Sequence, residues 1–244
     1  MLNNTQAHNH LRYWLIPSAL VSLMIAMYFS GNAALQQFVA PYPRREFGIL
    51  ENLQNVVLIA IIVIAIMGFR RAEFRLQKTG YGLLTLMTLF LLGEELDYGL
   101  HYYEAWHGIG WFDRIEVRNL HNQGDLTDTI KKIVDLGLIL FFVILPWCVR
   151  ETSGQWLRYI APSRYFTIAA FAMFFLSKFA HALQDAGAGT VEGSIPMLSS
   201  NISEFRELFF YYVIMTYLMD VTFRRQWPGT GQPDQAGQTG KSGQ

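Results

Sequence analysis

The sequence predicts an all-α membrane protein, a polytopic bundle of about six transmembrane helices. Hydrophobic residues make up 52% of the 244-residue chain, and the mean hydropathy is +0.20. The apolar residues come in continuous blocks, not in the stripes of amphipathic helices or the alternation of strands. Charged residues amount to 16% and concentrate between these blocks.

The first apolar segment, residues 13–29, follows Arg12 and has no small-residue cleavage site after it. We therefore expect a retained signal-anchor helix instead of a removed signal peptide, with residues 1–12 as a cytoplasmic N-terminal segment. Residues 227–244 are rich in Gly, Gln, Pro and Ser and should form a disordered tail. The transmembrane domain is then 13–226.

The other five apolar segments are short for a membrane span. They are residues 56–69, 81–92, 136–148, 165–180 and 208–219. At about 1.5 Å per residue, such segments cover roughly 18–24 Å of a hydrocarbon layer about 30 Å thick. Each helix must therefore be completed by polar residues at one end.

The completing residues are acids, histidines and amides, and alternation of six spans places all of them on one side of the membrane. They are Glu46, Glu51, Asn52 and Asn55 before the second segment, Glu94, Glu95 and Asp97 after the third, Asp128 and Asp135 at the fourth, His181 and Asp185 after the fifth, and Glu204 and Glu207 before the sixth. This pattern predicts an ionisable chamber within one leaflet.

Arginines and lysines crowd the short loops on the opposite side, around residues 70–78 and 150–164. The positive-inside rule therefore predicts cytoplasmic termini and an extracytoplasmic chamber. The loop 98–127 is too aromatic for a linker, so we expect it to fold back onto the membrane as a re-entrant or amphipathic segment, with a short helix near 113–119.

Glu94 and Glu95 are the most informative acids. Adjacent carboxylates beside an apolar segment repel each other and are costly in lipid, so they need a cation, a basic partner or a proton. The alternative is that both lie above the membrane and are hydrated. Glu104 and His107, spaced i, i+3, are compatible with a shared metal or with a solvated interfacial helix.

The fifth segment carries Ser177, Lys178, His181 and Asp185 on one helical face. Lys178 could neutralise the acids internally, or its long stem could carry the ammonium to the interface. His181 could be a metal ligand or a general base, in either case oriented by the carboxylate of Asp185. It could also be a hydrogen-bonded histidine at the membrane interface.

The sixth segment opens with Ser203, a candidate helix cap, and Glu204, which the positive helix end explains. Glu207 lies one turn deeper, with Tyr211 four residues later. Glu51 and Asn55 in the second segment have the same spacing.

We predict a site for a divalent ion, Zn²⁺, Mn²⁺, Fe²⁺ or Ca²⁺. Its predicted ligands are Glu51, Glu95, His121, His181 and Glu207, and its predicted catalytic residues are Glu94, Asp97 and Asp185. His121 and His181 should meet in this site.

The chain resembles a group of uncharacterised bacterial multi-pass membrane proteins that carry a Glu-Glu-x-x-x-Gly segment and a Leu-His-Asn segment. The matching residues are Glu94, Glu95, Gly99, Leu120, His121 and Asn122, with further similarity at Glu46, Gly48, Glu51, Glu204 and Glu207. The resemblance covers residues 45–210, with Tyr98 where the group has tryptophan. The resemblance implies a shared architecture in a bacterial inner (plasma) membrane and brings no activity.

Ser177, His181 and Asp185 are also similar to the zinc site of ceramidase and progestin-receptor-like membrane hydrolases, although the paired-histidine helix of those proteins is missing.

Three functions follow as hypotheses. The first is a metal-dependent hydrolase or oxidase acting on a lipid or lipid-linked substrate. The others are a cation- or proton-coupled transporter and a noncatalytic assembly protein. The balance of 19 basic and 19 acidic residues gives no sign of nucleic-acid binding, and the single Cys148 excludes an intrachain disulfide.

Overall fold

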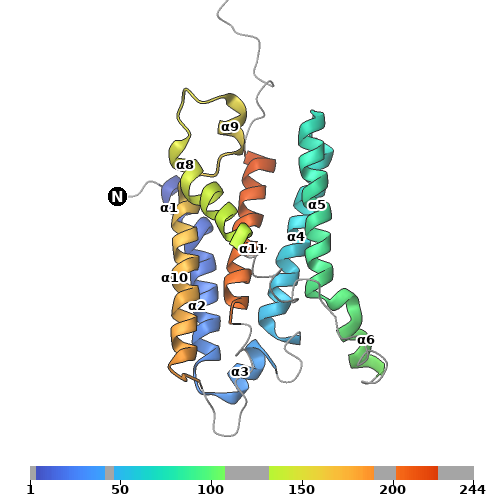
Figure 1. The fold of residues 1–244 in the computed structure, drawn as a ribbon, viewed down its shortest axis with the longest axis vertical. Coiled ribbons are helices and arrows are strands. Elements are labelled where there is room, and N and C mark those ends of the chain that lie inside the picture. The colour runs from blue at the N-terminus through green and yellow to red at the C-terminus, as the bar shows by residue number, and fades with distance from the viewer. Residues whose placement is uncertain (1–3, 42–46, 108–131, 190–201, 225–244) are drawn as a thin grey trace, which may run out of the picture.

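The computed structural model describes residues 4–41, 47–107, 132–189 and 202–224. Every regular element in these residues is a helix, which confirms the all-α class, and the long helices run roughly side by side in a bundle (Figure 1). The predicted tail 227–244, the predicted helix near 113–119, and Glu46, Asp128 and His121 lie outside the described residues.

The elements follow the apolar segments in order. They are α1 (Asn4–His10), η1 (Leu11–Leu15), α2 (Ile16–Tyr28), α3 (Ala33–Val39), α4 (Ile49–Arg71), α5 (Arg75–Glu95), η3 (Asp97–Gly99), α6 (Leu100–His107), a helical stretch at 132–138 continuing into η5 (Ile139–Ile144) and α8 (Leu145–Cys148), α9 (Gln155–Ile160), α10 (Tyr165–Asp185), α11 (Glu204–Met219) and η6 (Asp220–Arg224).

Helices therefore occupy all six predicted segments. Three of them are long and apolar enough to cross a membrane: Gln6–Tyr28 and Ile49–Arg71, with 23 residues each, and Tyr165–Asp185, with 21. The first helix begins at Asn4, within the segment expected to precede the membrane, so Arg12 is part of this helix. Membrane association rests on these three helices, and crossing by α5, 132–148 and α11 stays a prediction.

Helix α11 is the centre of the bundle. One apolar cluster joins it to α2, α10 and the start of α4, around the fully buried Phe166, Phe205 and Phe209. A second cluster joins it to α4 and α5, around Leu58 and Ile61. In Figure 1, α11 and α4 lie between α10 on one flank and α5 on the other.

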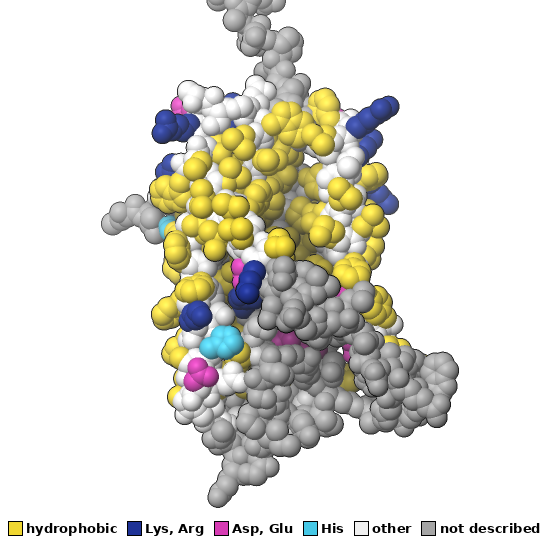
Figure 2. Space-filling model, viewed as in Figure 1, with side chains coloured by type: hydrophobic (Ala, Val, Ile, Leu, Met, Phe, Trp, Pro, Cys, Tyr) yellow, Lys and Arg dark blue, Asp and Glu magenta, His cyan; other side chains and the backbone are white. Residues whose placement is uncertain are grey.

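The outer surface of the bundle is apolar. Leu86 and Met87 on α5 are each 65% exposed, and Phe175 on α10 is 66% exposed. Figure 2 shows a broad band of hydrophobic side chains on one face, with Lys and Arg both above and below it. Such a band fits contact with lipid tails and would be unfavourable in water.

Contacts at one end join segments far apart in the sequence. The Tyr81 hydroxyl pairs with Thr222 Oγ1 at 3.1 Å, and the Tyr159 hydroxyl donates to the Val221 carbonyl at 3.1 Å. The first half of α5, the α9 segment and η6 therefore meet at one end of the bundle. Which side of the membrane this end faces remains a prediction.

Candidate functional site

The polar ends of α4, α5 and α11 come together at the other end of the bundle. Helix α4 packs against both α5 and α11. The hydroxyl of Tyr211, a residue only 6% exposed, donates a hydrogen bond of 2.7 Å to Oε1 of Glu95. Glu207 and Glu204 also lie close enough to Tyr211 to act on its hydroxyl electrostatically. One acid noted in the sequence thus binds this phenol directly, and two more act on it through their charge.

Gln54 connects α4 to the same group of residues. It is completely buried, and its Nε2 donates to the carbonyl of Glu204 at 2.9 Å and to Oε2 of Glu204 at 3.0 Å. The sequence analysis does not include Gln54 among the polar ends. Its spacing of i+3 from Glu51 would have been the signal, because such residues share a helical face.

Two of the three predicted polar residues within α4 are also buried, and the third, Asn52, is partly exposed. Glu51 is 7% exposed and Asn55 8%. The Oδ1 atom of Asn55 and the Oε1 atom of Gln54 have no hydrogen-bond partner among the described residues. The start of α4 therefore buries three polar side chains inside the bundle.

The end of α5 is shaped by a left-handed turn. Asp97, Tyr98 and Gly99 have φ angles of 47°, 52° and 85°. Positive φ is costly for Asp and Tyr, and such strain often marks a functional site. The turn folds the Tyr98 ring over Gly93, where a Cβ would lie 3.0 Å from the ring.

This turn positions a partner for Glu94. The carboxylate of Glu94, a residue 2% exposed, accepts a hydrogen bond from the Tyr98 hydroxyl. That hydrogen bond is the main cause that raises the pKa of Tyr98 above its ordinary value. Asp97 lies beside this pair, and its buried Oδ1 has no hydrogen-bond partner in the described part of the chain. Glu94 is therefore buried and hydrogen-bonded, unlike in the alternative in which it lies above the membrane in water.

His181 and Asp185 are placed elsewhere. Both lie on α10, on the flank of the bundle opposite α5 (Figure 1), and Asp185 is exposed. Lys178 is exposed as well, with Nζ 5.7 Å from the centre of the Phe174 ring, an arrangement that suits an ammonium reaching along the surface. In the described part of the chain, no hydrogen bond or ion pair joins these residues to the carboxylates of α5 and α11, although α10 packs against α11.

The predicted metal site is not assembled from the described side chains alone. Within residues 4–41, 47–107, 132–189 and 202–224, no group of three or more His, Cys, Asp or Glu side chains is placed to hold a metal ion. The side chains of Glu104 and His107 are not described. The proposed meeting of His121 with His181 lies outside what the structure describes.

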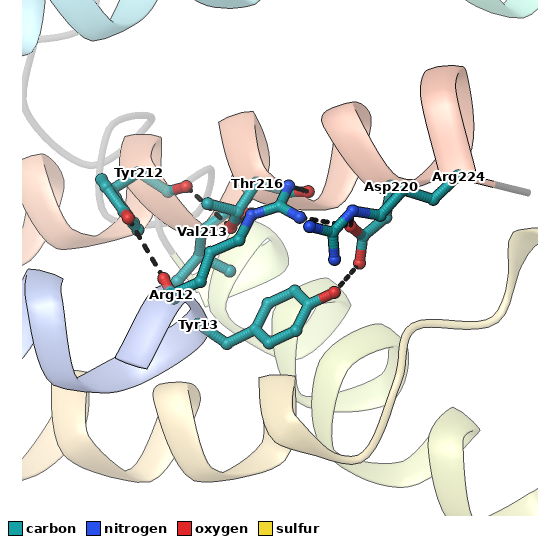
Figure 3. Close-up of polar contacts among 7 residues, drawn as sticks. All are labelled: Arg12, Tyr13, Tyr212, Val213, Thr216, Asp220 and Arg224. Carbon is teal, nitrogen blue, oxygen red and sulfur yellow. Dashed lines mark hydrogen bonds and ion pairs between the residues drawn. The ribbon is translucent and has the colours of Figure 1, made fainter. Parts of the chain in front are cut away.

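A second polar cluster, which the sequence analysis missed, lies at the opposite end of α11 (Figure 3). Arg12 and Asp220, with side chains 12% and 7% exposed, form an ion pair of 3.1 Å. The Tyr13 hydroxyl donates to Asp220 Oδ2, and Arg224 lies 3.8 Å from Oδ1. Asp220 and Arg12 are 208 positions apart, so no local pattern could reveal their contact.

Both sides of this ion pair lie in π-helical turns, η1 and η6. A π-helical turn disturbs the regular bonding of the backbone, and partner side chains use the carbonyls nearby. The Tyr212 hydroxyl donates to the carbonyl of Arg12 at 3.1 Å, and Arg12 reaches the carbonyl of Thr216 at 3.4 Å. The cluster thus fastens the first helix to the last.

A buried apolar cluster lies between α4, α5 and α11. Leu58, Ile61, Ile64 and Leu218 pack there with the rings of Tyr211 and Tyr81.

Fold and site together define a helical membrane protein with a buried carboxylate and amide cluster between three helix ends. Comparisons with protein-family models, curated proteins and solved structures give no significant match. The functional assignment accordingly depends on this chain's own residues, and the resemblance to bacterial multi-pass proteins remains a prediction.

Proposed function

We propose that the protein is an integral membrane enzyme that uses a divalent cation to act on a lipid or lipid-linked substrate. The proposal depends most on one observation, the contact between Glu95 of α5 and Tyr211 of α11 in the electrostatic field of Glu207 and Glu204. Carboxylates gathered in a low-dielectric interior favour a bound cation, because the cation offsets their mutual repulsion.

In this proposal, Glu95 and Glu207 contribute to cation binding. Glu94 is the acid–base residue, with Tyr98 holding its carboxylate in place. A bound divalent cation would polarise a carbonyl or phosphoryl oxygen, or activate a water molecule. The surrounding apolar surface suits a lipid substrate, which reaches the site from the membrane and not from water. His181 and Asp185 have no part in this version of the site.

Transport of a cation or protons is the second candidate, favoured by the polar cluster around Arg12 and Asp220 in the other half of α11. A transport path would have to connect the two clusters. No hydrogen bond or ion pair among the described residues joins the Glu95–Tyr211 contact to the Arg12–Asp220 pair, so transport requires a connection that the enzyme does not need.

The test combines metal analysis with lipid turnover. Full-length protein, purified in detergent, is analysed for bound metals and then reconstituted in vesicles of bacterial polar lipids, whose composition is followed by mass spectrometry. We expect bound divalent metal and the loss of a lipid species that a chelator prevents. Glu95→Gln should reduce both, while Asp135→Asn, at a side chain 46% exposed and paired with Arg206, should reduce neither.

Two results would contradict the proposal. Purified protein without metal, inactive on every lipid supplied with metal, would favour the noncatalytic assembly role. Cation or proton flux across the vesicles without lipid turnover would favour transport.

A further inference from the structure

A groove on the surface of the bundle lies between α2 and α10, and its residues belong to neither polar cluster. Its volume is about 260 Å³, and its lining includes Ser22, Ile25 and Ala26 of α2 and Leu176, Phe179 and Leu183 of α10. In Figure 1 these two helices run side by side on one flank of the bundle.

Small side chains on α2 create the hollow. Ser22 and Ala26 are one turn apart on the same helical face, and both are exposed. The neighbouring Phe179 of α10 is 46% exposed and stacks with Phe175, their ring centroids 6.4 Å apart. The groove thus combines two small residues with a large aromatic wall, while Ile25, only 2% exposed, connects it to the apolar core.

The groove lies in the part of the molecule that crosses the hydrocarbon layer. Both of its helices belong to the three apolar enough to span a membrane, Gln6–Tyr28 and Tyr165–Asp185. On α10 the lining extends from Leu176 to Leu183, which is about 10 Å along the axis and fits within one leaflet of about 15 Å. The groove therefore runs along the helices, in the direction of lipid chains.

The size and lining of the groove restrict what can fill it. Apolar cavities stay dry and accept apolar guests, so water is a poor occupant. A helix with its side chains needs roughly 400 Å³ per turn, so the groove cannot seat even two turns of a partner helix. An empty groove would leave the surrounding side chains without contacts on one side. A single hydrocarbon chain is thin enough to enter and restores those contacts.

We propose that the groove between α2 and α10 binds one acyl chain of a membrane phospholipid and retains it longer than the lipids around the rest of the bundle. None of the residues that line the groove is charged, so the site selects the chain and not the headgroup. The proposal uses the membrane association of α2 and α10 and is independent of the proposed enzymatic function.

The test is photolabelling of the full-length protein in phosphatidylcholine vesicles that contain some phosphatidylcholine with a diazirine on its acyl chain. Mass spectrometry locates the labelled residues. Ala26→Leu fills the groove, so we expect the label on Phe179 and Leu183 to fall by about threefold or more. Phe175, which is 66% exposed and does not line the groove, should keep its label because it contacts bulk lipid.

Two further variants complete the design. Ala182→Leu is the matched control, since it makes the same change at an exposed position of α10 outside the groove, and it should leave the label on Phe179 and Leu183 unchanged. Ser22→Leu fills the groove from a second position, so it repeats the test if Ala26→Leu does not fold by circular dichroism. Native mass spectrometry in detergent should find one retained phospholipid on the natural protein and none on a filled variant.

Four results would overturn the inference. In the first, both filled variants keep the natural labelling. In the second, Ala182→Leu lowers the label as much as Ala26→Leu, so that the label reports general surface contact. In the third, the protein is a dimer that Ala26→Leu dissociates, which would assign the groove to a second copy. In the fourth, labelling requires phosphatidylglycerol in the vesicles, which would make the headgroup the recognised part.

Discussion

The ion pair between Arg12 and Asp220 gives the sharpest stability prediction. The two charged groups are 3.1 Å apart, and their side chains are only 12% and 7% exposed. At an effective dielectric constant of about 20, their Coulomb attraction is about 5 kcal/mol, which offsets the loss of hydration of both groups. Asp220→Leu leaves Arg12 buried without its carboxylate. We therefore expect the free energy of unfolding to fall by about 3–5 kcal/mol.

The remaining contacts of the cluster predict an asymmetry between the two partners. Arg12→Met leaves Asp220 with the Tyr13 hydroxyl and with Arg224 at 3.8 Å, so it should cost less than Asp220→Leu. In the double variant no uncompensated charge from the pair remains. Its cost should fall below the sum of the single costs by at least about 2 kcal/mol, the usual sign of a coupled buried pair.

The assay is chemical or thermal unfolding of the detergent-purified variants at low and high salt. The pair Arg206–Asp135 is the matched control, with a distance of 3.3 Å and side chains 30% and 46% exposed. Its removal should cost less than about 1 kcal/mol and should lose its effect at high salt. Additive single effects at Arg12 and Asp220, or a cost for Asp220→Leu as small as that of the control, would refute the burial argument.

Three further predictions concern packing, titration and topology. Gly68→Ala should destabilise the protein by about 1–3 kcal/mol in thermal unfolding, because the new Cβ would lie 2.3 Å from the Tyr81 ring. Gly80→Ala is the control, since nothing lies within 4 Å of its Cβ position, and it should be neutral or stabilising by up to about 1 kcal/mol. Equal effects of the two variants would contradict this packing. The pKa of Tyr98 is raised chiefly by its hydrogen bond to Glu94, so the stabilisation from this bond is present below the ordinary tyrosine pKa of about 10 and is lost as pH rises through the raised value. Glu94→Gln should bring the Tyr98 titration, followed by ultraviolet difference absorbance against Tyr98→Phe, back toward that ordinary pKa, and an unchanged titration would exclude the contact. A reporter fused after residue 226 should be active only in the cytoplasm, and activity on the other side would reverse the predicted orientation.

The helices themselves could be predicted, because blocks of apolar residues determine them directly. The sequence also identified the residues that end α5 and begin α4 and α11, since short apolar segments must be completed by polar ones. Glu94, Glu95, Glu204 and Glu207 were found in this way. Their partners could not be predicted, because helical periodicity says which face a residue occupies and not which helix that face meets. The bond from Tyr211 to Glu95 joins positions 116 apart.

The same limit explains the two residues that the sequence analysis did not select. Gln54 sits among the polar residues that open α4, yet only its contact with Glu204 distinguishes it from a solvated amide. In the sequence, Asp220 looks like an ordinary charged residue at a helix end. Its ion pair with Arg12 depends on the packing of the first helix beside α11, which the sequence does not show. In both cases tertiary packing gives a local polar residue its role.

The length of α11 explains why the carboxylates of both clusters need partners inside the bundle. Glu204 and Asp220 lie sixteen positions apart in one helical segment, about 24 Å along the axis. A hydrocarbon layer is about 30 Å thick, so a crossing α11 cannot keep both carboxylates in water. Each acid therefore needs partners within the protein. Asp220 pairs with Arg12, a cation of the chain itself, and accepts a hydrogen bond from Tyr13, so its cluster joins the first helix to α11. Glu204 accepts a hydrogen bond from the Gln54 amide, and this contact joins the start of α11 to α4.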